Sequence, residues 1–138
     1  MSVTGVNLGL IIHAPTIAYL YYLTTLMLGR VADLNDVGAL ILNAEHELGM
    51  ARTSTYPIDN LRRAFNYVVK ALAIREGLPE VQGAVRTGHW TNQLITSAVM
   101  RLSDKLLTVK ELWLSLNQES LTNIDETIGK VRELLRAF

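Results

Sequence analysis

The sequence predicts an all-α protein, a single-domain helical bundle of five to six helices. Apolar residues recur at helical spacing along most of the 138 residues. No segment alternates apolar and polar residues beyond a few positions, and no Asn-Gly or Asp-Gly pair indicates a hairpin. The length is that of one domain, and with 49% hydrophobic residues the chain can bury a substantial core. We therefore expect an apolar N-terminal helix within residues 1–32 and a helical bundle formed by residues 33–138.

The N-terminal segment contains no charged residue from Met1 to Gly29. A membrane span is not expected there, because His13 and Pro15 interrupt the run and its tyrosines lie inside it rather than at its ends. A secretory signal is not expected, because no basic leader precedes the run. We expect a buried helix from about Thr16 to Ala32 that is used in assembly, since so small a chain can hardly cover it alone. The residues expected at the interface between copies are Tyr19, Leu20, Leu23 and Leu26.

Two long helices are expected next. Asp33 is predicted to cap a helix from about Leu34 to Arg52, whose outer face carries Glu45 and Glu47. A Tyr-Pro pair after a short polar linker opens the second helix, because proline suits a first helical turn, and Gly77 ends it. The apolar seam of this second helix consists of Ile58, Leu61, Phe65, Val68 and Leu72.

The C-terminal half is expected to contain shorter helices. The stretch 77–90 is predicted to hold one short helical turn between loops, because it contains a proline and several glycines. Thr91 is predicted to cap the next helix, and Thr–acid pairs at capping-box spacing predict helix starts at Thr108 and Thr122. The last helix is expected to run close to the C-terminus, with Glu126 and Lys130 as an ion pair. Its apolar seam consists of Ile124, Ile128, Val131, Leu135 and Phe138.

The composition excludes several classes of function. With 13 basic and 13 acidic residues, the chain is not a strongly basic nucleic-acid clamp. It carries no phosphate-binding loop, zinc-protease, EF-hand or nucleophile-elbow motif. The absence of cysteine excludes disulfides and thiol chemistry, and it is compatible with a thermophilic habitat. We expect no cofactor and no metal site.

Two small sets of residues could still serve a function. Arg62, Arg63 and Lys70 share the outer face of the second long helix and could contact phosphates, the alternative being an ordinary solvated face. Arg86 and His89 could form a polar site, the alternative being a loop histidine that packs beside its tryptophan neighbour.

From about residue 44 to residue 138 the order of features is that of a known group of helical domains. The segments concerned are Glu47–Arg52, Arg63–Ala73, Gly88–Trp90, Glu111–Glu119 and a terminal Val-Arg-x-Leu-Leu helix. They resemble HEPN-like domains, particularly the PaREP-type archaeal relatives, and the resemblance implies a four-helix fold and a tendency to dimerise. Active HEPN ribonucleases carry an Arg, four to six variable residues and a His. Here Arg86 lies only three residues before His89, and Leu116-Asn117 stands where relatives tend to place a His.

We therefore expect a non-catalytic, cytoplasmic HEPN-like protein that acts through self-association and through binding of nucleic acid or a second protein. The alternative is a structural subunit of a filament or virion, in which the apolar N-terminal helix packs between copies. An enzyme that uses Arg86 and His89, or a membrane-anchored helical protein, are further alternatives.

Overall fold

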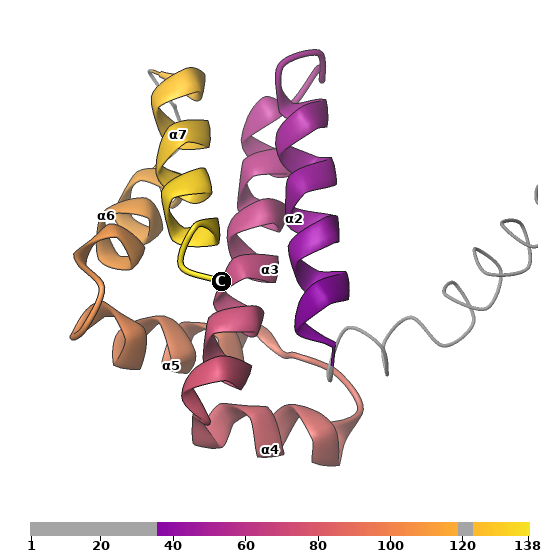
Figure 1. The fold of residues 1–138 in the computed structure, drawn as a ribbon, viewed down its shortest axis with the longest axis vertical. Coiled ribbons are helices and arrows are strands. Elements are labelled where there is room, and N and C mark those ends of the chain that lie inside the picture. The colour runs from indigo at the N-terminus through magenta and orange to yellow at the C-terminus, as the bar shows by residue number, and fades with distance from the viewer. Residues whose placement is uncertain (1–35, 119–122) are drawn as a thin grey trace, which may run out of the picture.

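Residues 36–118 and 123–138, which the computed structural model describes, form six helices and contain no strand (Figure 1). The helices are α2 (Val37–Ala51), α3 (Pro57–Glu76), α4 (Pro79–Thr87), α5 (Asn92–Ser103), α6 (Leu107–Leu116) and α7 (Ile124–Leu135). The predicted all-α class is thus confirmed. The helix expected over residues 16–32 lies outside the described residues, as do its four interface residues. Among the described helices, none is both long and apolar enough to cross a membrane.

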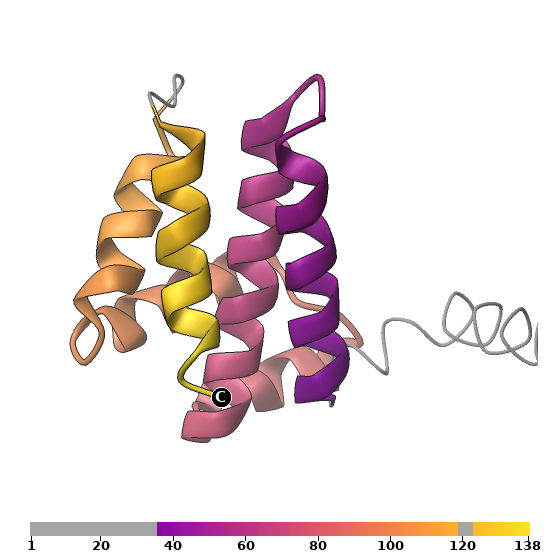
Figure 2. The ribbon, with the colours of Figure 1, turned by 45° about the horizontal axis from the view of Figure 1, so that its top comes forward.

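Helix α3 is the common partner of the other five described helices. Figures 1 and 2 show α2 on one side of α3 and α7 on another, with α6 beside α7, while α4 and α5 cross one end of the bundle. Nine of the 20 residues of α3 are buried, more than in any other described helix. Its fully buried or nearly buried residues include Leu61, Ala64, Phe65, Val68, Val69, Ala71, Leu72 and Ala73. The core is therefore built around this helix.

The ends of the first two described helices follow from local capping. Helix α2 begins at Val37 and is capped by Asp36, whose Oδ1 accepts a hydrogen bond of 3.2 Å from the backbone N–H of Ala39. The start predicted after Asp33 is therefore about one turn too early. Helix α3 begins at Pro57 as predicted, and Gly77 ends it in the left-handed conformation, with φ of 66°.

The prediction of a single helical turn between residues 77 and 90 is wrong, because α4 extends over nine residues. Pro79 opens this helix, where its missing N–H is harmless. Gly83 does not break it but lies against α5, since a Cβ there would come within 2.9 Å of Leu94 Cδ2. Gly88, with φ of 81°, supplies the end. Gly83 thus allows α4 to approach α5 closely, and Gly88 ends α4.

The caps of the last three helices agree only in part with the predictions. Thr91 caps α5 as predicted, accepting from the N–H of Leu94 at 3.1 Å. Helix α6 begins at Leu107, so Thr108 lies inside it and its hydroxyl instead donates to Glu133 of α7 at 3.0 Å. Asn123, not Thr122, caps α7. Thr122 itself lies outside the described residues.

Two side-chain predictions for the last helix have different outcomes. The ion pair between Glu126 and Lys130 is confirmed, with 3.9 Å between Oε2 and Nζ. Phe138 was expected in the apolar seam but lies beyond the end of α7 and is 40% exposed. Its ring packs instead under the guanidinium of Arg75, with 4.8 Å between Cζ and the ring centre.

Candidate binding site

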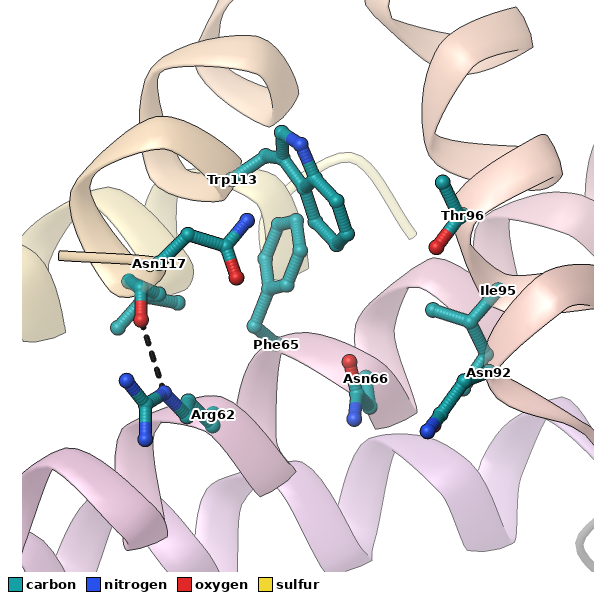
Figure 3. Close-up of a pocket in the computed structure, with 9 residues that line it drawn as sticks. Arg62, Phe65, Asn66, Asn92, Ile95, Thr96, Trp113 and Asn117 are labelled. Carbon is teal, nitrogen blue, oxygen red and sulfur yellow. Dashed lines mark hydrogen bonds between the residues drawn. The ribbon is translucent and has the colours of Figure 1, made fainter.

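Helices α3, α5 and α6 enclose a pocket of about 340 Å³ (Figure 3). Its lining consists of Arg62, Phe65, Asn66, Asn92, Ile95, Thr96, Trp113, Leu116 and Asn117. Each helix supplies three lining residues, counting the cap residue Asn117 with α6. In each set two residues lie four positions apart: Arg62 with Asn66, Asn92 with Thr96, and Trp113 with Asn117. Residues at this spacing lie on one face of a helix, so three helix faces converge on the same space.

One wall of the pocket is aromatic. Figure 3 shows the rings of Phe65 and Trp113 close together, across the space from Ile95 and Thr96 of α5. Phe65 is only 2% exposed and belongs to the core, and Trp113 is half-buried against that core. Both rings contact the core, and the wall presents an apolar, polarisable surface.

The polar part of the lining is made of amides, one hydroxyl and one guanidinium. The amides of Asn66, Asn92 and Asn117 and the hydroxyl of Thr96 can each donate and accept hydrogen bonds. Within residues 36–118 and 123–138, these four side chains make no hydrogen bond to another residue. The pocket therefore offers several polar groups that a partner could use.

Arg62 is the ionic residue of the lining. Its Nε donates to the backbone carbonyl of Leu116 at 2.8 Å, and its Nη1 lies 3.7 Å from the carboxylate of Asp59. The last carbonyls of an α-helix lack partners within the helix, so Arg62 fixes the C-terminal end of α6 at the edge of the pocket. Its charge is already opposed by Asp59.

The structure separates the three basic residues predicted to contact phosphates. Arg62 reaches toward α6, whereas Arg63 reaches toward α2, where its Nε lies 3.2 Å from Glu47 Oε2. Lys70 lies over the ring of Tyr67, with 5.3 Å from Nζ to the ring centre. The two arginine charges thus serve contacts between helices and diverge from each other.

Glu47 does not lie on an outer face as predicted. Its side chain is only 16% exposed, and its Oε1 accepts a 2.9 Å hydrogen bond from the amide of Asn60, which is buried. Asn60 and Arg63 both belong to α3, so Glu47 connects α2 to α3 through both of its oxygens. The prediction failed because the spacing of apolar residues identifies the buried stripe of α2. It does not show whether a neighbouring helix also covers the polar residues beside that stripe.

Arg86 and His89 lie at the exposed end of α4 and in the loop after it, and neither lines the pocket. Nδ1 of His89 lies 3.2 Å from the carbonyl oxygen of Thr87. In the described part of the chain, the two side chains form no hydrogen bond with each other. The neighbouring Trp90 is half-buried against the core.

Glu80 is a buried charge that the sequence did not indicate. It belongs to α4 and is 6% exposed. Its Oε2 accepts hydrogen bonds from Ser97 and, at 2.9 Å, from Nε of Arg101, both on α5. Burial alone would raise the pKa of Glu80, but these hydrogen bonds and the positive charge of Arg101 together hold that pKa below its usual value. Glu80 therefore remains ionised and joins α4 to α5.

In residues 36–118 and 123–138, no group of His, Asp and Glu side chains is arranged to hold a metal ion. No protein-family model, curated protein or solved structure matches the chain. The function therefore has to be argued from the chain itself.

Proposed function

We propose that the chain is a non-catalytic helical protein, HEPN-like in the order of its sequence features, that associates with copies of itself and binds a partner. Nucleic acid is the partner expected from the basic residues Arg62, Arg63 and Lys70. The pocket between α3, α5 and α6 is the observation that supports binding rather than catalysis.

The chemistry of the pocket favours binding over catalysis. Its nine described lining residues supply aromatic and aliphatic surface, amides, a hydroxyl and a guanidinium. The nine lining residues include no histidine, carboxylate, lysine or cysteine, the side chains that most often serve as a general acid or base. A recess of this kind can select and retain a group without changing it.

Contacts to nucleic acid would come from Arg62, Arg63 and Lys70. Because Asp59 and Glu47 already oppose the two arginine charges, each contact to a phosphate competes with an ion pair within the protein. We therefore expect weak, sequence-independent binding that falls steeply with salt, since each phosphate contact releases a counterion.

Sedimentation of the full chain over a range of concentrations tests self-association. A discrete dimer or small oligomer supports the proposal, and a monomer at every concentration contradicts it. Open-ended assembly would favour the alternative of a filament or virion subunit, for which the uncharged run from Met1 to Gly29 is the supporting observation.

A cleavage assay on single-stranded RNA tests whether the protein is catalytic. We expect no cleavage by the wild-type protein, because no described pair of groups provides acid–base chemistry at the pocket. His89→Ala is the matched variant, because an enzyme that uses Arg86 and His89 is the catalytic alternative. Cleavage by the wild type that disappears in this variant would overturn the proposal.

A further inference from the structure

We propose that the pocket between α3, α5 and α6 receives a tyrosine side chain from residues 16–28 of a second copy of the chain. The inference rests on the proposed self-association and assigns it a site. It follows from the lining of the pocket, from its charge, and from the composition of the N-terminal segment.

The apolar part of the lining suits an aromatic ring. Phe65 and Trp113 form one wall, and Ile95 faces them across the space in Figure 3. A ring inserted there would lie against two aromatic rings in the offset or edge-to-face arrangements that aromatic groups prefer. A volume of about 340 Å³ is at the small end for ligand pockets and suits a side chain rather than a whole helix.

The polar part of the lining suits a phenol. A phenolic hydroxyl donates one hydrogen bond and accepts others. The amides of Asn66, Asn92 and Asn117 can supply both kinds of partner at the edge of the pocket. A tyrosine hydroxyl can exchange hydrogen bonds with these amides, whereas a phenylalanine or leucine side chain cannot, which favours tyrosine among the apolar residues of the segment.

The charge of the pocket favours a neutral occupant. Arg62 is the ionic residue of the lining, and it is already held by the carboxylate of Asp59 and the carbonyl of Leu116. An anionic ligand would have to compete with these contacts. The segment before Arg30 carries no charge, and it contains three of the chain's five tyrosines, Tyr19, Tyr21 and Tyr22.

A second copy is the better source of the tyrosine than the same chain. Inserting one side chain into its own pocket would leave most of an uncharged run of this length uncovered. Two copies that exchange their N-terminal segments can pack the two runs against each other while each fills the other's pocket. Asp36, the first described residue, directly precedes α2. Helix α2 packs on α3 and α7 and contributes no residue to the pocket lining.

The first test blocks the pocket in the full chain. Thr96→Phe places a ring in the space, and Gln93→Phe places the same ring on an exposed position of the same helix as a control. We expect Thr96→Phe to weaken self-association by about tenfold or more, with helix content unchanged and with no effect of the control. Asn117→Trp, at the exposed edge of the pocket, repeats the test if Thr96→Phe does not fold.

The second test removes the occupant. Replacing Tyr19, Tyr21 and Tyr22 together with Ala should weaken association as much as the blocked pocket does. Tyr56→Ala, at an exposed tyrosine outside the segment, is the control and should change nothing.

A mixing experiment then decides between exchange and self-insertion. The blocked-pocket variant keeps an intact segment, and the tyrosine-free variant keeps an intact pocket. If copies exchange segments, mixing the two variants restores one of the two insertions per pair, so the mixture should associate more strongly than either variant alone. Self-insertion predicts no such gain, and its absence would overturn the proposal.

Three further outcomes bear on this inference and on the proposed function. A wild-type protein that is monomeric at all concentrations contradicts both. A wild-type protein that associates while the Thr96→Phe and triple-tyrosine variants associate equally well contradicts only the pocket assignment. Trp113 can report on an RNA occupant once Trp90→Phe has removed the other tryptophan. If RNA changes the fluorescence of Trp113 in the unblocked pocket but not in the Thr96→Phe variant, the occupant is RNA and the inference is overturned.

Discussion

Glu80 shows how one buried residue can tie a short helix to the rest of the bundle. Its carboxylate lies between α4 and α5, held by Ser97 and Arg101, and Arg101 remains about half exposed. Water therefore still solvates the cation, while the anion depends on the protein for its hydrogen bonds. Removing the charge of Glu80 should cost stability without leaving an unhydrated charge behind.

We expect Glu80→Gln to lower the free energy of unfolding at neutral pH by about 1–3 kcal/mol, because charge-assisted hydrogen bonds are lost. Chemical denaturation measures the change. Glu111→Gln, at an exposed position on α6, is the control and should change stability by less than about 0.5 kcal/mol. Equal stability of the two variants would show that Glu80 does not hold α4.

The same residue predicts the direction of a pH effect. The pKa of Glu80 is lowered in the folded state, so folding favours the carboxylate. Its contribution to stability is present above the unfolded pKa and is lost as the pH falls through the lower folded pKa. Glu80→Gln should therefore lose less stability than the wild type on acidification, as measured by melting temperature at a series of pH values.

At the scale of elements, the sequence predicted a helix correctly where its local signals agree with one another. The periodic seam of α3, its opening proline and its closing glycine agree, so its limits were predicted correctly. Helix α4 was missed because Gly83 was interpreted as a helix breaker, although its small size serves contact with Leu94 on another helix. Thr108 was assigned a local cap but bonds to Glu133 on α7. Both errors concern residues whose partners lie on a different helix.

The pocket was missed for the same reason. Asn66 and Asn92 are separated along the chain by α4, and spacing within each helix gives no sign that their faces converge. Among the predicted site residues that the structure describes, Arg62 lies in the lining, whereas Arg63, Lys70, Arg86 and His89 do not. The signal in the sequence is the pairs of polar or aromatic residues four positions apart on three helices. These pairs predict a pocket only once it is known that the three helices pack together.

Two glycines of different backbone conformation should respond in opposite ways to alanine. Gly129 lies within α7, and a Cβ there would meet nothing within 4 Å, so Gly129→Ala should stabilise the protein by about 0.5–1 kcal/mol. Gly77 has φ of 66°, so Gly77→Ala should destabilise it by about 1–2 kcal/mol. Thermal melting of the two variants measures both effects, and shifts of the same sign would contradict this account.

At the scale of the whole molecule, the proposed self-association rests on the uncharged N-terminal run. Replacing Leu20 and Leu23 with Glu should give a dissociated or insoluble protein, because two charges cannot be buried between copies without partners. Sedimentation measures the outcome. A soluble, folded double variant with unchanged assembly would refute a role for this run.

Helix α3 also determines how the bundle comes apart. Helices that precede it and follow it in the chain all pack on it, so each of them loses contacts if it unfolds. The described helices should consequently open together rather than one by one, with the amides of α3 among the slowest to exchange with solvent. The described helices should therefore form a single cooperative unit, so a destabilising substitution in α3 should lower the stability of every helix that packs on it.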